Sequence, residues 1–292
     1  MAILTRILVP VEFSPRCQGA IQYAAALARH FQGEIALLHV VVPPSSVYGF
    51  SEAAAYTNAP DLQAEIVASR KDQLNTFAAG ALQELPVTRV VLEGDPAHLI
   101  VQYARQIDAG LIVMPTHGHG PFRRFLLGSV TAKVIHDAEC PVWTGPHMED
   151  APLPETICFC RVLCAVDLGL DSRAVLGWAS AFAREYGSEL ATVHAIPSSN
   201  TRLGGVYFDP DWSIHVANDA RKRISEIQED LKISGEISIP VGDPPHAITA
   251  TATNWKANLL VIGRGRHGGV LGRIRTNAYA ILRESPCPVV AV

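Results

Sequence analysis

Short runs of β-branched and apolar residues alternate along the chain with longer segments in which apolar residues recur every three or four positions. A short apolar run predicts a buried strand, and the three-to-four spacing predicts an amphipathic helix. In the first half the pattern predicts strands over residues 4–11, 35–42, 87–92, 110–115 and 141–144. It predicts helices over residues 15–32, 61–84, 96–107 and 129–138. Strands that alternate with helices are typical of a parallel sheet, so the pattern favours the α/β class.

The second half of the chain repeats the first. RILVPVEF, from Arg6, corresponds to RVLCAVDL, from Arg161; EGDPAHLI corresponds to VGDPPHAI, and AECPVW to SPCPVVAV. The same elements recur in the same order, which indicates a tandem duplication. We expect one domain over residues 1–145 and a second over 157–292. The proline- and acid-rich segment 146–156 is predicted to be an extended linker with no regular element.

The two GDP segments predict helix starts. Asp95 and Asp243 can accept hydrogen bonds from free helix amides, and Pro96 and Pro244 suit the first helical position, where a missing N–H costs nothing. With right-handed crossovers, each half becomes a doubly wound, five-stranded parallel sheet. A ligand is then expected beyond the carboxyl ends of the strands, where the strand order reverses.

The charge of the chain argues against two classes of partner. A formal net charge of −4 at pH 7 gives no broad basic field to attract nucleic acid or an acidic membrane surface. The N-terminal apolar run, bracketed by Arg6 and Glu12, is too short for a signal peptide or a membrane span. We therefore expect a cytoplasmic protein with neither nucleic acid nor membrane as a partner.

The cysteines and histidines give no metal signature. Six cysteines in 292 residues do not make a disulfide framework and indicate a reducing compartment. Cys158, Cys160 and Cys164 share one parity of a predicted strand but lack C-x-x-C spacing, so we interpret them as buried structural thiols. His117 and His119 have no matching carboxylate or cysteine pair nearby. We predict no metal site.

The stretch VIGRGRHGG contains G-x-G-x-x-G at Gly263, Gly265 and Gly268. A dinucleotide fingerprint belongs at the first strand-to-helix turn, whereas Gly263 opens the last 30 residues, so the pattern disfavours a dehydrogenase. The corresponding stretch of the first half, MPTHGHGPFRRFLLGSVTAKVI, crosses a glycine-bearing loop and enters a helix at Gly128 and Ser129. The exposed amides and the positive dipole of such a helix start can hold a phosphate chain.

On these residues both halves resemble universal stress protein domains, soluble α/β modules of which many bind ATP through a G-2x-G-9x-G-(S/T) loop. The resemblance covers nearly the whole chain apart from the linker. It includes the first strand, the LLHV strand, the loop after the fourth strand and the CPV ending.

The resemblance implies a nucleotide site in the first half. Gly118 and Gly128 match the second and third glycines of the loop and Ser129 follows them, while Pro115 replaces the first glycine. Glu12 stands where such domains usually carry an aspartate. The implied nucleotide-binding residues are Pro10, Val11, Glu12, Val40, Met114, Pro115, Gly118, His119, Gly128, Ser129 and Val130.

The second half departs from the loop differently. Asp167 keeps the aspartate and Gly263 matches the first glycine, but Arg275 replaces a later one. We favour a degraded or altered site over the alternative, an arginine pocket for phosphate formed by Arg264, Arg266, Arg273 and Arg275. The implied residues here are Asp167, Ala195, Gly263, Gly265, Arg275 and Thr276.

Three functions remain in competition. The leading hypothesis is a non-enzymatic regulatory protein that binds ATP, with Mg²⁺ as an optional companion, or another adenine nucleotide, in the first half. The second is a universal stress protein that binds no nucleotide and acts through protein partners; Pro115, Glu12 and Arg275 favour it. The third is a slow ATP hydrolase, disfavoured because no base, nucleophile and orienting group occur together.

The last strand of each half, VWTG and VVAV, is apolar and is expected at a sheet edge, where a bare strand would be hazardous. We therefore expect the two halves to pair as an intramolecular pseudo-dimer. The resemblance further implies a homodimer of chains.

Overall fold

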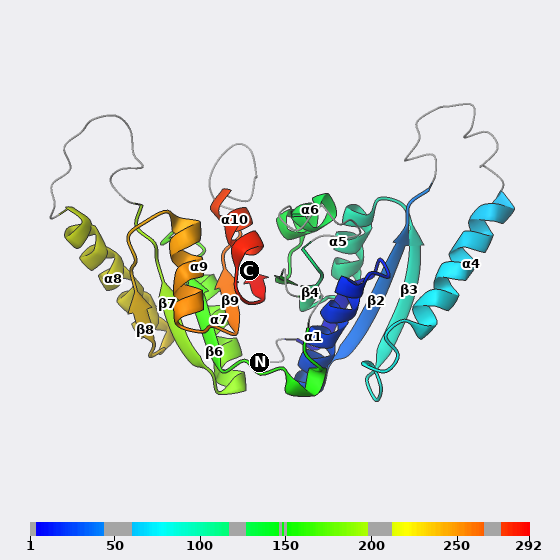
Figure 1. Cartoon of the computed structure of the whole chain (residues 1–292), viewed down its shortest axis with the longest axis horizontal. Coiled ribbons are helices and arrows are strands. Elements are labelled where there is room, and N and C mark those ends of the chain that lie inside the picture. Colours follow the sequence, from blue (N-terminus) through cyan, green and yellow to red (C-terminus); the bar gives the residue numbers. More distant parts are fainter. Residues whose placement is uncertain are drawn as a thin grey trace, which may run out of the picture. The chain divides into compact units, whose positions relative to one another are not determined.

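The structure is a computed structural model (Figure 1) and describes residues 4–43, 60–116, 127–145, 148, 151–197, 212–265 and 276–292. The chain divides into two compact units, Met1–Ile157 and Cys158–Val292, called here the first and the second unit. Among the described residues, no helix combines the length and the apolar character that a membrane crossing requires.

Strands and helices alternate through both units. The first unit contains β1 (Arg6–Pro10), α1 (Pro15–Phe31), β2 (Glu34–Val41), α4 (Pro60–Thr76), β3 (Val87–Glu93), α5 (Pro96–Gln106), β4 (Leu111–Val113), α6 (Ser129–Asp137), β5 (Val142–Thr144) and a short 3-10 helix, η2 (Pro154–Thr156). The second unit contains β6 (Arg161–Ala165), α7 (Ser172–Tyr186), β7 (Glu189–Val193), α8 (Trp212–Leu231), β8 (Glu236–Ser238), α9 (Pro244–Asn254), β9 (Leu259–Ile262), α10 (Thr276–Glu284) and β10 (Val289–Ala291).

Each unit contributes five parallel strands. Their order is β3-β2-β1-β4-β5 in the first unit and, equivalently, β8-β7-β6-β9-β10 in the second. In the first unit Leu8 of β1 lies opposite Ala36 of β2 on one side and Ile112 of β4 on the other. The direction of winding therefore reverses between β1 and β4, and the predicted doubly wound α/β fold is confirmed.

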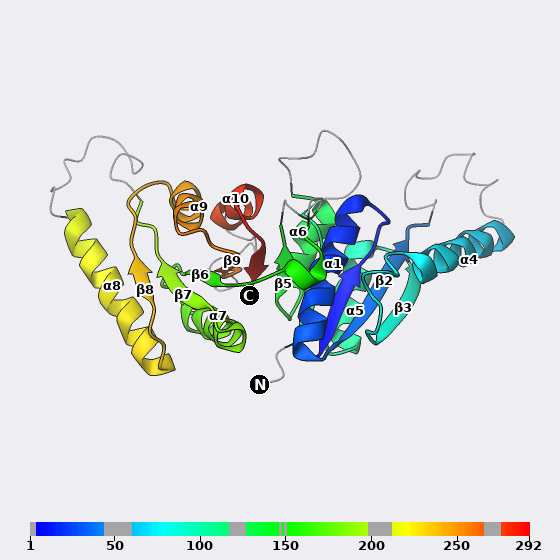
Figure 2. The same ribbon diagram turned by 60° about the horizontal axis from the view of Figure 1, so that its bottom comes forward.

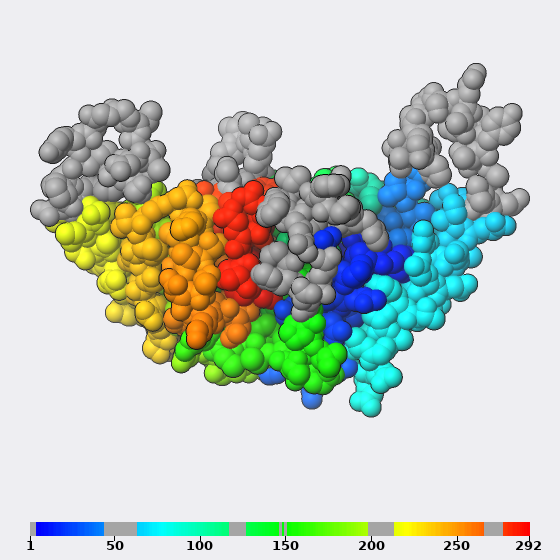
Figure 3. Space-filling view, viewed as in Figure 1, coloured from blue at the N-terminus to red at the C-terminus, as the bar shows by residue number. Residues whose placement is uncertain are grey.

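Helices cover both faces of each sheet (Figure 2). The face of the first unit seen in Figure 3 carries α1 and α4, in blue and cyan, and the visible face of the second carries α9 and α10, in orange and red. The central strands are consequently buried on both sides: the side chains of Ile7, Leu8 and Val9 are fully buried, as are those of Leu111 and Ile112. Continuous apolar runs are what such doubly covered parallel strands require.

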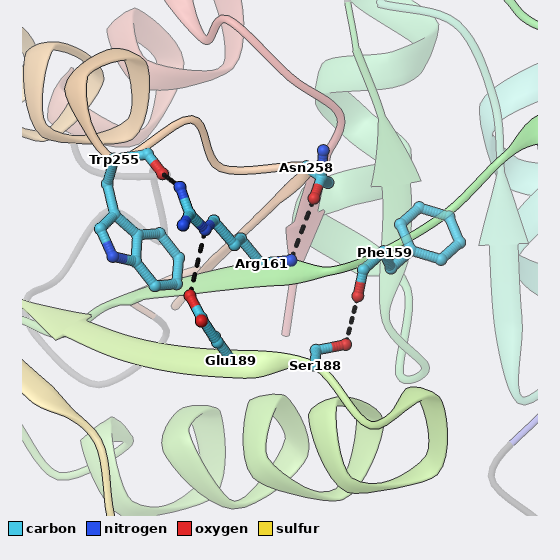
Figure 4. Close-up of polar contacts among 6 residues, drawn as sticks. All are labelled: Phe159, Arg161, Ser188, Glu189, Trp255 and Asn258. Atoms are coloured by element: carbon cyan, nitrogen blue, oxygen red, sulfur yellow. Dashed lines mark hydrogen bonds and ion pairs between the residues drawn. The ribbon is translucent and has the colours of Figure 1, made fainter.

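In each unit, an arginine at the start of the first strand links neighbouring elements at the amino ends of the strands. In the second unit, Arg161 pairs with Glu189 at 3.0 Å and donates to the carbonyl of Trp255, as Figure 4 shows. In the first unit, Arg6 pairs with Glu34 at 2.7 Å and donates to the carbonyl of Ile107. This strand-start anchor joins β1 to β2 and to the end of α5, and β6 to β7 and to the end of α9.

The predicted helix at 61–84 is too long. The structure ends α4 at Thr76, and a turn follows in which Ala78 has a φ of 53°. Left-handed backbone cannot continue a right-handed helix. Arg29 of α1 holds the turn by donating to the carbonyl of Ala81 at 3.0 Å, a tertiary contact that the local pattern does not contain.

The expectation of a linker without regular structure is also wrong in part. Pro154–Thr156 forms η2, and Glu155 pairs with Arg29 of α1 at 3.2 Å. Met148 is 1% exposed, and its carbonyl oxygen lies so close to Gly19 that a Cβ there would stand 1.5 Å from it. Gly19 therefore permits a backbone approach that any side chain would block.

Candidate functional site

The turn after β1 brings a carboxylate to the carboxyl end of the sheet. The Val11 amide donates to the carbonyl of Leu38 on β2 at 2.8 Å, which extends the pairing by one residue. Phe13 then adopts a φ of 64°, and Ser14 caps α1 by accepting from the Cys17 amide. The Ser14 hydroxyl also donates to the carboxylate of Glu12 at 2.9 Å. Glu12 is thus oriented by the same residue that starts the helix.

A histidine on β2 lies beside this turn and bonds to it. His39 Nδ1 donates to the carbonyl of Val11 at 2.7 Å, and the equivalent His194 makes the same contact with Val166 at 2.9 Å. Burial lowers the pKa of His39, and the nearby charge of Arg70 lowers it further. His39 was not among the residues predicted for the site, although Val40 was; the LLHV motif, which repeats as TVHA, was the available signal.

The opposite wall is the start of α6. Gly128 is its N-cap, with φ −63° and ψ 144°, and no side chain caps the helix. The Gly128 amide donates to the carbonyl of Thr116 at 2.8 Å, and Thr131 Oγ1 donates to the carbonyl of Pro115 at 3.0 Å. These two bonds hold the helix start against the end of β4. Among the described residues, no side-chain cap accepts from its first-turn amides, which suits an anionic ligand.

These elements surround a cavity of about 360 Å³, called here the first hollow, at the carboxyl ends of β1, β2 and β4. Nine of the eleven predicted residues line it: Pro10, Val11, Glu12, Val40, Met114, Pro115, Gly128, Ser129 and Val130. The other two, Gly118 and His119, lie outside the described residues. A volume of this size falls within the range of small-molecule sites.

Residues outside the predicted set also line the first hollow. Pro96 and Ile100 come from the start of α5, and Cys17 comes from α1. Burial raises the pKa of the Cys17 thiol, so it lines the hollow as a neutral group. At the rim, Lys133 of α6 lies 3.5 Å from Asp95, the residue that caps α5.

The second unit has a cavity of about 400 Å³ in the equivalent place, called here the second hollow. Four predicted residues line it: Asp167, Ala195, Gly263 and Gly265. Thr276 begins α10, and Gly268, Arg266, Arg273 and Arg275 lie outside the described residues. Asp167 accepts from the Gly169 amide at 2.8 Å and from the Ser172 hydroxyl at 3.2 Å.

The described residues leave a space here at least as large as the first hollow. Arg275, on which the expectation of an altered site rests, lies outside the described residues, so that expectation stays a prediction. Arg264 lines the second hollow, but it is 3% exposed and its Nε donates to the carbonyl of Ala291 at 3.1 Å. That contact directs Arg264 toward the end of β10, which weighs against the arginine pocket, the alternative that the sequence did not favour.

The interpretation of the cysteines as buried thiols is wrong for two of the three. Cys164 is fully buried on β6, and burial raises its pKa, but Cys158 and Cys160 are exposed. Phe159 between them takes the buried position instead. The larger, more apolar ring occupies the core side of the segment, which turns the flanking thiols to solvent. Within the described part of the chain, no three His, Cys, Asp or Glu side chains gather as a metal-binding group.

Comparison with known proteins gives one consistent result. The model of the universal stress protein family matches residues 4–144 and 159–292. Universal stress protein MJ0531 of Methanocaldococcus jannaschii is 30% identical over 139 residues, which are 47% of this chain and 79% of that protein. Universal stress protein Mb2028c of Mycobacterium bovis is 28% identical over 222 residues, 73% of this chain and 71% of that protein.

Among solved structures, a universal stress protein from Archaeoglobus fulgidus DSM 4304 matches with a TM-score of 0.63. The match covers 99% of this chain and 96% of that one at 21% identity. At this identity the likeness extends to the fold alone.

Proposed function

Since this chain belongs to the universal stress protein family, we propose that it is a regulatory protein whose first unit binds ATP or another adenine nucleotide in the first hollow. The observation that carries the proposal is the convergence of nine residues, which the family resemblance implies for nucleotide binding, on one cavity of about 360 Å³. Those residues come from four separate segments of the chain.

The two ends of the first hollow suit the two ends of a nucleotide. Leu38, Val40 and Met114 supply an apolar wall for a base, beside backbone groups that can read its edge. Glu12 can accept from ribose hydroxyls. Ser129 and the uncapped amides at the start of α6 supply donors and a positive dipole for phosphates.

Pro115 leaves the first hollow open. Its side chain lines the cavity without filling it, and its carbonyl is engaged by Thr131. Glu12 is the only carboxylate among the described residues that line the cavity. Binding rather than metal-assisted phosphoryl transfer is therefore the activity that this wall supports best.

Calorimetry with ATP, with and without Mg²⁺, tests the proposal, and Gly128→Val is the decisive variant. Gly128 has a backbone conformation open to any residue and lines the first hollow, so we expect the valine methyl groups to occupy space that the nucleotide needs. We expect loss of measurable binding. Gly80→Val is the matched control, because a Cβ at Gly80 would have no atom within 4 Å.

The stoichiometry distinguishes the two hollows. One ATP per chain, abolished by Gly128→Val, supports the first hollow alone. A second equivalent that survives the substitution assigns binding to the second hollow as well. No heat at millimolar ATP overturns the proposal in favour of a protein that acts only through partners. Unchanged binding in Gly128→Val shows instead that the first hollow is not the nucleotide site.

We also propose a cytoplasmic location and self-association of the chain into a homodimer. All six cysteines are free thiols, which suits a reducing compartment. The homodimer rests on the family resemblance, since universal stress proteins commonly form dimers. Light scattering across a concentration series tests the dimer, and a constant monomer mass at all concentrations contradicts it.

A further inference from the structure

Two thiols stand side by side on the surface of the second unit. Cys158 and Cys160 are both exposed and free. They flank the buried Phe159, so both side chains lie on the outward face of the segment. The pair lies just ahead of β6, outside the second hollow, and the proposed nucleotide function leaves it unused.

The backbone that carries the thiols is held in place on both sides. The ring of Phe159 is 3% exposed and packs against Phe182 and Tyr186, with ring centroids 5.4 and 5.1 Å away. The Phe159 carbonyl accepts a hydrogen bond from Ser188, as Figure 4 shows. The Cys160 carbonyl accepts from the Glu189 amide at 2.9 Å.

The next residue is fixed as firmly. The Arg161 amide donates to Asn258 Oδ1 at 3.0 Å, and its side chain belongs to the strand-start anchor (Figure 4). The two thiols therefore project from a rigid segment, with little ordering left to do when a ligand binds. Such preorganisation strengthens binding.

We propose that Cys158 and Cys160 form a two-thiolate site for a soft monovalent metal ion, with Cu(I) as the ion that fits it best. Thiolates are the ligands that select Cu(I). A two-thiolate pair suits an ion that accepts two ligands, whereas a structural Zn²⁺ site needs four. The described residues supply no third His, Cys, Asp or Glu to complete such a set.

A disulfide fits the same segment less well. Two steps along extended backbone span roughly 6.6 Å, close to the upper limit for disulfide-bonded Cα atoms, and the Cβ atoms must approach to about 3.8 Å. The contacts of Phe159 and Cys160 with β7 and its preceding turn oppose that contraction. A metal ion between the sulfurs fills the remaining distance. Binding replaces the two S–H bonds with two Cu–S bonds and releases both protons to solvent.

Anaerobic titration of the reduced, full-length protein with Cu(I), in competition with a chromophoric Cu(I) chelator, tests the site. We expect one tightly held ion per chain, with two sulfur neighbours in X-ray absorption. Cys158→Ser and Cys160→Ser should each weaken binding about a hundred-fold, because the remaining thiolate loses the chelate effect. Cys140→Ser, which removes a half-buried thiol in the first unit, is the matched control and should bind as the parent does.

Unchanged Cu(I) binding in the Cys158→Ser/Cys160→Ser double variant overturns the proposal, as does dependence on Cys140. Failure of the parent to bind also overturns it. Peroxide treatment that yields a Cys158–Cys160 disulfide in a chain that does not retain Cu(I) would assign the pair to thiol oxidation instead. Both thiols are exposed, so circular dichroism should show unchanged folding in the serine variants.

Discussion

At the scale of single residues, the most informative comparison is between Pro115 and its counterpart Gly263. A Cβ at Gly263 would lie 3.2 Å from the Val175 side chain, so the second unit has little space for a larger residue there. By the repeat, Val175 corresponds to Ala20 in the first unit, which lacks those methyl groups. The smaller Ala20 thus accompanies the larger Pro115. Pro115, which replaces the first glycine of the loop, is therefore accompanied by a smaller residue at the neighbouring position 20.

We predict that Gly263→Ala destabilises the second unit by about 1 kcal/mol through overpacking. In a Val175→Ala background the same substitution should cost nothing, since the opposing methyl groups are gone. Urea unfolding of the four proteins in this double-mutant cycle measures the coupling. Equal costs of Gly263→Ala in both backgrounds would show that the two positions do not compete for space.

The histidine that closes the first hollow makes stability depend on pH. Burial lowers the pKa of His39 in the folded protein, so the unfolded chain binds a proton at a higher pH than the folded one. Unfolding free energy should accordingly be highest above the unfolded pKa of about 6.5 and fall as the pH drops below it. His39→Asn keeps a donor for the Val11 carbonyl and removes the titration. Its pH profile should be flatter between pH 7 and 5, and an identical slope would contradict the assignment.

At the scale of elements, most starts and ends follow from local chemistry. Asp95 and Asp243 cap α5 and α9, and Pro96 and Pro244 open them, as predicted. The caps differ in geometry: Asp95 Oδ1 accepts from the His98 amide at 2.7 Å, whereas Asp243 accepts from the His246 amide at 3.5 Å. The hydrogen bond from His98 is the largest cause of the lowered pKa of Asp95.

We expect Asp95→Ala to cost about 1 kcal/mol of stability and Asp243→Ala clearly less. The folded pKa of Asp95 is depressed, so its contribution is present above the unfolded pKa of about 3.9 and is lost as the pH falls through the folded one. Denaturant unfolding at pH 7 measures both substitutions. Asp95→Asn keeps the acceptor and should retain most of the stability; a loss equal to that of alanine would argue against capping.

The sequence pattern did not predict the contacts between residues that are far apart in the chain. The strands and the helix starts depend on periodicity and capping, which are local, whereas the nine predicted residues of the first hollow follow from the family resemblance. The end of α4 depends on Arg29, more than forty residues away in sequence, donating to Ala81. Cys158 and Cys160 are exposed because Phe159, which lies between them, is buried against α7. That packing contact is not visible in the local sequence pattern.

At the scale of the whole molecule, each unit contains its own five strands and its own buried central strands. We predict that residues 1–157 and 158–292, expressed separately, each fold with a cooperative thermal transition. The first fragment should keep the ATP affinity of the full chain. An unfolded first fragment, judged by circular dichroism, would show that its fold requires the second unit.

The strand-start anchors lie at the amino ends of the strands, whereas both hollows open at the carboxyl ends. The residues that hold each sheet together and the residues that line its cavity thus lie at opposite ends of the same strands. After a gene duplication, the loops of one copy can change so that they bind a new ligand, or none, while the strand-start anchor of that copy still holds its sheet together. Divergence between the two copies should therefore accumulate at the open rim first, with little penalty for folding.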